Sequence, residues 1–236
     1  MNFSAILALV FILAFANTAS LQAQKVYNDS KNYMDYSKKP YYFGITLGYN
    51  QADYRVIQSQ RFILHDSIKS VVSGQGPGFN LGIVTNLNVG KNFDFRVLPT
   101  LSFTERRLRY TMLNQTETSR SIESVFIELP FQVRYKSAPY HDMRLFLVAG
   151  MKYGFDVASN SRARQAEKLI KVAASDFSVE YGAGVQVFLP YFIFSPEFKV
   201  SQGIGNVIIY DTNLQQASVL ERLLSRAFTL SFHFEG

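Results

Sequence analysis

The sequence contains no cysteine and no tryptophan, and it is poor in charge. The absence of cysteine excludes a disulfide scaffold, a thiolate metal site, a cysteine nucleophile and a lipidated N-terminal cysteine. Charged residues make up 18% of the chain, below the roughly 25% of an average soluble domain. No apolar run reaches the ~20 residues of a membrane helix, which excludes a polytopic helical membrane protein. The net charge of +6 is not clustered, so no nucleic acid partner is expected.

Phenylalanine and tyrosine are abundant, with 21 Phe and 14 Tyr among the 236 residues. A chain that is 47% hydrophobic can bury a core, which excludes a disordered protein. The length suits one large domain or two small ones. Aromatic enrichment favours strands, because these side chains pack well on a pleated surface.

An unbroken apolar run covers residues 6–16. It is too short to span a bilayer, and small and polar residues follow it, as in a secretory signal. We predict a cleaved signal peptide over residues 1–23 and a polar periplasmic tail over residues 24–39. The alternative, a buried N-terminal helix, fits the length and the flanking residues less well.

From residue 40 to residue 236, apolar and polar residues alternate with a period of two, which is the pattern of strands with two different faces. Eight such segments occur, each close to the 9–11 residues of a tilted membrane strand. They cover residues 41–49, 79–89, 93–103, 125–135, 143–155, 177–187, 192–200 and 228–234. We therefore predict an all-β fold: one domain, residues 40–236, forming an eight-stranded antiparallel transmembrane outer-membrane β-barrel.

The connections alternate in length. Short turns fall at residues 90–92, 137–141 and 189–191, and long loops are expected at 58–78, 105–123, 158–176 and 202–225. Short turns at one end and long loops at the other are typical of outer-membrane barrels, with both termini on the periplasmic side. The basic residues at 158–174 indicate either a solvated loop or a short helix beside lipopolysaccharide, which with the outer-membrane lipid is an expected partner.

A soluble, lipocalin-like barrel has the same periodicity with the apolar face inward. Two features favour the membrane barrel. The polar face is rich in glycine, which suits a crowded lumen, and aromatic residues gather at the strand ends as in interfacial girdles. Three prolines lie within the predicted strands. Proline lacks the backbone N–H that pairs with a neighbouring strand, and a closed barrel has no edge strand where this loss would be tolerated. We expect local bulges at Pro99, Pro130 and Pro196.

Charged residues share the polar face with the glycines. An eight-stranded barrel is just wide enough to be filled by its own side chains, so these charges are expected to pair in a structural network. A solute path is the alternative. The predicted lumen network consists of Arg96, Glu128, Arg134, Arg144, Lys152, Glu180, Glu197 and Lys199.

The last long loop carries apolar residues at nearly helical spacing. Such a stripe either folds over the barrel rim or docks a partner. The predicted partner-docking residues are Ile208, Ile209, Tyr210, Leu214, Leu220, Leu223 and Leu224.

Several segments resemble the PorT family of outer-membrane barrels from Bacteroidetes, called SprT in gliding bacteria. Residues 126–136 (FIELPFQVRYK) and 176–190 (DFSVEYGAGVQVFLP) resemble many barrels. More specific are residues 39–49 (KPYYFGITLGY), 78–110 and 220–235 (LERLLSRAFTLSFHFE). The resemblance implies an assembly or accessory component of the type IX secretion system, which exports proteins with C-terminal targeting domains and serves gliding motility where present. Other type IX components would then be its partners.

Two other functions are compatible with the residues: a stand-alone structural or adhesion barrel, and a barrel enzyme acting on lipids or peptides. The enzyme's best candidate is His65–Asp66–Ser67, yet sequence neighbours rarely converge into a triad. We therefore expect no enzyme, cofactor, metal or small-molecule substrate.

Overall fold

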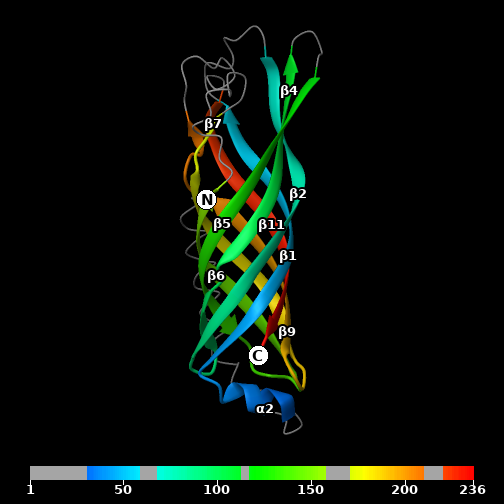
Figure 1. Ribbon diagram of the computed structural model, residues 1–236, viewed down its shortest axis with the longest axis vertical. Coiled ribbons are helices and arrows are strands. Elements are labelled where there is room, and N and C mark those ends of the chain that lie inside the picture. The colour runs from blue at the N-terminus through cyan, green and yellow to red at the C-terminus, as the bar shows by residue number, and fades with distance from the viewer. Residues whose placement is uncertain (1–30, 59–67, 113–116, 158–170, 210–219) are drawn as a thin grey trace, which may run out of the picture.

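The computed structural model describes residues 31–58, 68–112, 117–157, 171–209 and 220–236. Nine strands form one antiparallel sheet that wraps into an elongated barrel with tilted strands (Figure 1). They are β1 (Tyr41–Gln58), β2 (Ile68–Val89), β3 (Phe93–Val97), β4 (Thr100–Met112), β5 (Glu117–Lys136), β6 (Met143–Asp156), β8 (Ser175–Phe188), β9 (Ile193–Gly203) and β11 (Leu220–Glu235). A separate two-stranded ribbon joins β7 (Lys171–Val172) to β10 (Ile208–Ile209).

The sheet closes because β1 pairs with both β2 and β11. β3 and β4 follow one another in line between β2 and β5, so together they fill one position in the ring. The ring therefore has eight positions, which confirms the predicted fold class. Closure removes the two edges that an open sheet would expose. We call the end with the short connections at residues 90–92, 137–142 and 189–192 the turn end, and the opposite end the loop end.

The apolar face of the strands points outward. Ile45, Leu81 and Leu145 are between 48 and 63% exposed, whereas Thr46 and Arg144, their chain neighbours, are buried inside. Phe79 and Phe103 stack on the outer surface with ring centroids 4.4 Å apart. An apolar outer band around a polar interior is the arrangement of a membrane barrel. The lipocalin-like alternative is therefore excluded.

Two of the predicted long loops are largely strand. β2 begins at Ile68 and β4 continues to Met112, while β5 begins at Glu117. The β4–β5 ladder runs without a shift from Thr100↔Glu128 to Thr111↔Glu117. The prediction was wrong because polar residues on both faces remove the period-two signal, whereas ladder hydrogen bonds need no apolar side chains.

The predicted bulges at Pro99, Pro130 and Pro196 are also absent. The strand register is the same on both sides of each proline, so the ladder is interrupted without an inserted residue. At Pro99 the carbonyl still accepts a hydrogen bond from the Ile83 N–H at 3.0 Å. The β2–β4 register shifts instead within residues 75–78, next to Pro77, in a segment that we had interpreted as a loop.

One short helix, α2 (Lys31–Ser37), lies across the turn end of the barrel (Figure 1). The rings of Tyr33 and Tyr36 contact Phe188, with centroids 5.2 and 6.1 Å away. Asp142 accepts a hydrogen bond from the Tyr33 backbone N–H at 3.1 Å. This part of the predicted polar tail is therefore folded onto the barrel. No helix in the described part of the chain has the length and apolarity to cross a membrane.

Candidate functional site: the charged lumen

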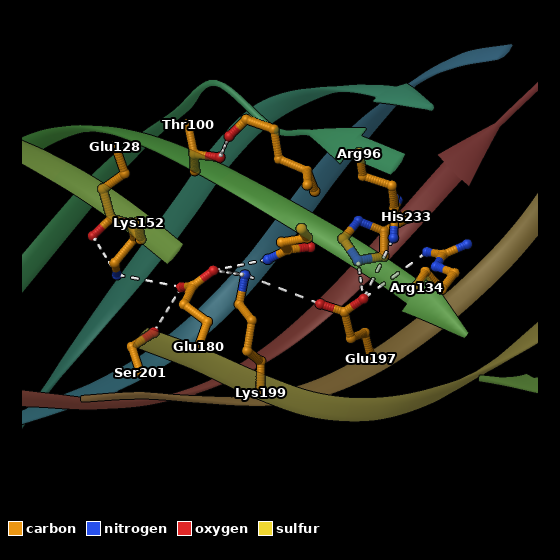
Figure 2. A network of polar contacts seen from close by, with 12 residues as sticks. Arg96, Thr100, Glu128, Arg134, Lys152, Glu180, Glu197, Lys199, Ser201 and His233 are labelled. Atoms are coloured by element: carbon orange, nitrogen blue, oxygen red, sulfur yellow. Dashed lines mark hydrogen bonds and ion pairs between the residues drawn. The ribbon is translucent and has the colours of Figure 1, made fainter. Parts of the chain in front are cut away.

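Five ionisable side chains from four strands meet in the lumen near the turn end. Figure 2 shows four of them, Arg96, Arg134, Glu197 and His233. Arg96 Nη1 lies 3.4 Å from Glu197 Oε2, and Arg134 Nη2 lies 3.4 Å from Glu235 Oε1. Arg96 also pairs with Glu235. These four side chains are completely buried, and His233 Nε2 approaches Glu197 Oε2 to 3.5 Å. We call these five residues the turn-side cluster.

A second group lies further along the lumen and is held by lysines. Lys152 Nζ is 3.0 Å from Glu128 Oε1 and 3.6 Å from Glu180 Oε1. Lys199 Nζ is 3.3 Å from Glu180 Oε2, and the Ser201 hydroxyl donates to Glu180 at 2.7 Å. The side chains of Lys152, Lys199 and Glu128 are 10 to 12% exposed. We call Glu128, Lys152, Glu180 and Lys199 the loop-side cluster.

The two clusters form one network along the lumen. Lys199 Nζ reaches 4.0 Å from Glu197 Oε1, and Gln132 donates a hydrogen bond to Glu180 at 2.8 Å. Charges of opposite sign therefore alternate along the barrel axis, which compensates the cost of removing each from water. The structure brings seven of the eight predicted lumen residues into this network; Arg144 lies apart from them.

Arg144 lies at the turn end, where its hydrogen-bond acceptors are neutral groups. Its Nε donates to the Ser137 carbonyl at 2.9 Å, and its Nη2 donates to the Lys91 carbonyl at 2.9 Å. Its Cζ is 5.2 Å from the centre of the Tyr33 ring, which belongs to α2. The side chain therefore links the barrel wall to the helix that covers it.

Packing leaves little free space beside the charges. The Phe146 ring lies 4.0 Å from Arg134 Cζ, and a Cβ on Gly184 would come within 2.3 Å of that ring. Glycine is required at this close approach. Towards the loop end, a cavity of about 20 Å³ borders Glu128 and Lys152, which is room for about one water molecule. The described lumen is thus filled along its length.

Sequence analysis missed several residues of the network. Asp94 on β3 pairs with Lys136 and accepts a hydrogen bond from the Tyr42 hydroxyl at 3.4 Å. Glu235 occupies the centre of the turn-side cluster, and Asp53 forms a two-point contact with Arg226 at 2.6 and 2.9 Å. The alternation already places Asp94 and Lys136 on the polar face, although neither is among the predicted network residues, and extending the last strand by one residue adds Glu235.

Polar residues replace the apolar ones on the outer face where the β4–β5 hairpin rises above the apolar band. Glu105 stands opposite Glu123, one step beyond Phe103. Arg107 donates to Glu105 at 2.8 Å, and so does the Ser121 hydroxyl. These two hydrogen bonds lower the pKa of the Glu105 carboxyl. The hairpin therefore presents a charged surface to water.

The described residues of the predicted docking loop are in strands, although their spacing is close to helical. Ile208 and Ile209 form β10, and Leu220, Leu223 and Leu224 belong to β11. Leu223 is fully buried, and its N–H donates to Asn206 Oδ1 at 2.9 Å. The 3.6-residue spacing was misleading because alternate residues of a strand also share a face. Tyr210 and Leu214 lie outside the described residues.

The hypothetical triad at residues 65–67 also lies outside the described residues, as do the predicted signal peptide and residues 24–30 of the tail. Within the described ranges, no group of three or more acidic or histidine side chains is arranged to hold a metal ion. The chemistry that the described lumen does support is ion pairing.

Comparison with known proteins agrees with this architecture. Residues 22–208 match the family described as outer membrane protein beta-barrel domain, and the chain belongs to that family. It is an outer-membrane β-barrel. This assignment is coarser than the resemblance to PorT. A search of curated proteins found no match.

Three solved structures have a similar fold. OprG from Pseudomonas aeruginosa aligns with a TM-score of 0.50 and 12% identity, covering 84% of this chain and 97% of that one. Neisserial surface protein A aligns with a TM-score of 0.45 and 11% identity, covering 83% and 97%. Ail, the attachment invasion locus protein of Yersinia pestis, solved with the heparin analogue sucrose octasulfate, aligns with a TM-score of 0.38 and 15% identity, covering 84% and 100%. At these identities the likeness concerns the fold alone.

Proposed function

We propose that the protein is a non-conducting, non-enzymatic barrel that works through contacts at its ends, as a structural or adhesion protein of the outer membrane. The observation that carries this proposal is the lumen filled by the turn-side and loop-side clusters. A route for solutes would require several lumen ion pairs to separate, and each separation leaves a buried charge without its partner.

The loop end offers the surface for such contacts. The β4–β5 hairpin continues beyond the apolar band and carries Arg107, Glu105 and Glu123 on its outer face. We place this end outside the cell and both termini in the periplasm, as short turns and long hairpins are arranged in bacterial barrels. A charged strand surface of this kind suits polar partners on a neighbouring surface.

Two experiments test the proposal. The purified barrel in a planar bilayer should show no ion-conductance steps, whereas a porin measured in the same bilayer should; steps from this protein would contradict the filled lumen. A deletion strain should then be complemented with the wild type or with a variant in which a two-residue turn joins Glu105 to Glu123. Loss of surface attachment with the short hairpin, but with an intact permeability barrier, would identify adhesion as the role.

The resemblance to PorT favours a second function, an accessory role in type IX secretion. Its support is the similarity of residues 39–49, 78–110 and 220–235 to that family. Such a barrel would act on assembly and would not carry substrates through its own lumen. Other secretion components would meet its hairpins, its lipid face or the turn end.

Quantitative mass spectrometry distinguishes the two functions. The culture medium and the envelope of wild type, deletion and complemented strains should be compared. Selective loss from the medium of proteins with type IX C-terminal domains, with their retention in the periplasm, would establish the secretion role. Unchanged secretion of that class would eliminate it and leave the structural or adhesion barrel.

A further inference from the structure

A pocket of about 640 Å³ lies at the turn end, between α2 and the connections below the barrel. Its volume falls within the roughly 300–1,000 Å³ of typical small-molecule sites. One wall comes from α2 and the residues after it, with Tyr33 and Lys38. The other comes from the β2–β3 turn and the start of β6, with Lys91 and Arg144.

Positive charge dominates this pocket. Among the described residues that line it, five are cationic and none is an aspartate or glutamate. They are Lys38, Lys39, Lys91, Lys136 and Arg144. Lys38, Lys39 and Lys91 are exposed, so their amino groups are free to turn towards a bound group. Only Lys136 has a carboxylate partner in the described part of the chain, the buried Asp94.

Arg144 is the most informative of the five. It is 5% exposed, and its three nitrogens donate to the carbonyls of Ser137 and Lys91 and to the Tyr33 hydroxyl. No carboxylate lies within 4 Å of it in the described residues, in contrast to Arg96 and Arg134 higher in the lumen. The carboxylate that acts on Arg144 from further away, Asp94, is already paired with Lys136. Two cations therefore share one buried carboxylate, and the resulting net positive potential favours an anion nearby.

The pocket is also held in shape before anything binds. The Asn88 N–H donates to the Pro40 carbonyl at 2.8 Å, which ties the segment after α2 to β2. Asp142 fixes the other end of α2 through the Tyr33 N–H. Lys39 Nζ lies 4.9 Å from the Tyr36 ring centre. A preformed site loses less conformational entropy on binding than a loop that must first be ordered.

We infer that this pocket binds a phosphate-bearing anion at the turn end of the barrel. Lysine amino groups act as point charges for phosphate oxygens, and the volume leaves room for the group that carries the phosphate. Phe93 and Tyr135, with ring centroids 5.2 Å apart, are exposed on the outer face of the strands that lead to this mouth. Both a phospholipid headgroup of the adjacent leaflet and a soluble phosphate ester therefore have access. The inference is independent of the proposed function.

The test uses the full-length barrel in nanodiscs and a triple variant, Lys38→Gln with Lys39→Gln and Lys91→Gln. These three side chains are exposed, so the barrel should fold as the wild type does. The matched control replaces three exposed cations at the loop end: Arg55→Gln, Arg107→Gln and Arg222→Gln. Glycerol 3-phosphate is titrated by calorimetry in phosphatidylcholine nanodiscs, and retained phosphatidylglycerol is counted by native mass spectrometry.

We expect the triple variant to weaken phosphate binding roughly tenfold or more, and the control to change it less than about twofold. Retention of phosphatidylglycerol without glycerol 3-phosphate binding would assign the site to a lipid headgroup, and binding of both would assign it to phosphate esters in general. Binding of neither, or equal binding by the triple variant, would overturn the inference. Binding of an acidic peptide without binding of either phosphate compound would also overturn the inference, because the site would then recognise protein carboxylates.

Discussion

The two lumen clusters hold charges of both signs, yet they differ in how those charges are accommodated. The turn-side cluster uses two guanidinium groups whose side chains have no exposure at all. The loop-side cluster uses two lysines, each 10 to 11% exposed and each close to two carboxylates. A small cavity borders the second cluster. Burial is therefore complete at one level of the barrel and partial at the next.

The difference in chemistry matches the difference in burial. An arginine is planar and always charged, so it can remain ionised where no water reaches it. A lysine is a flexible point charge that can exchange one carboxylate for another. We infer that the turn-side cluster fixes the width and register of the barrel. In the loop-side cluster, the lysines can change carboxylate partners without disturbing the strands. The following predictions test that division.

The largest effect is expected from Arg96→Met. The change removes one cationic partner from both Glu197 and Glu235 in a region without exposure, and breaking a buried pair costs about 3–5 kcal/mol. The measurement is urea unfolding of the barrel in phospholipid vesicles. Arg55→Met, an exposed change at the loop end, serves as the control and should alter the unfolding free energy by less than about 0.5 kcal/mol. A similarly small loss for Arg96→Met would show that the turn-side pairs are dispensable.

A pair of glycine substitutions compares packing at the two levels. In Gly184→Ala the new Cβ would lie 2.3 Å from Phe146 Cζ, and overpacking of this kind costs about 2 kcal/mol. In Gly154→Ala the nearest atom is 3.5 Å away, an ordinary contact. We expect a clear loss of unfolding free energy for the first variant and almost none for the second. Equal losses would mean that the lumen is packed alike throughout.

Much of the fold could be predicted from the sequence, because apolar and polar residues alternate along most of the barrel strands. Alternation predicts the eight positions of the ring, the short turns and the face on which the charges lie. In β6, for example, buried Arg144 is followed by exposed Leu145, and this alternation continues along the strand. The β4–β5 hairpin does not follow this alternation, because polar residues replace the apolar ones on its outer face beyond Phe103, as at Glu105 and Arg107.

The pairing of the charges could not be predicted in the same way. Arg96 meets Glu197 across 101 residues of chain, and Arg134 meets Glu235 across another 101. Which cation faces which carboxylate depends on the stagger of the strands around the barrel, a property of the whole ring. The packing of α2 against Phe188 is also a tertiary contact, and no periodicity in the sequence predicts it. Sequence alone indicated which residues point inward, and the closed ring determines their partners.

Lys152→Met should have a smaller effect than Arg96→Met. Glu180 keeps Lys199 and Ser201 as partners, and Glu128 borders the cavity where water can solvate it. We expect a loss of roughly 1.5 kcal/mol, the low end for a hydrogen bond to a charged group. The same urea titration measures it. A loss as large as that of Arg96→Met would remove the distinction between an adaptable cluster and a fixed one.

The smallest effect concerns pH and lies outside the membrane band. Glu105 has a lowered pKa because Arg107 and then Ser121 donate hydrogen bonds to its ionised form. Its contribution to the hairpin is therefore present above the ordinary carboxyl pKa and is lost as the pH falls through the lowered, folded value. Backbone amide resonances of Arg107 and Ser121 should shift in one step below the ordinary carboxyl range. The Glu105→Gln variant should lack that step, and the amides beside the buried turn-side cluster should not follow it. A step at the ordinary carboxyl pKa would show that the hairpin contacts do not persist in water, and that fixed ion pairs belong to the lumen alone.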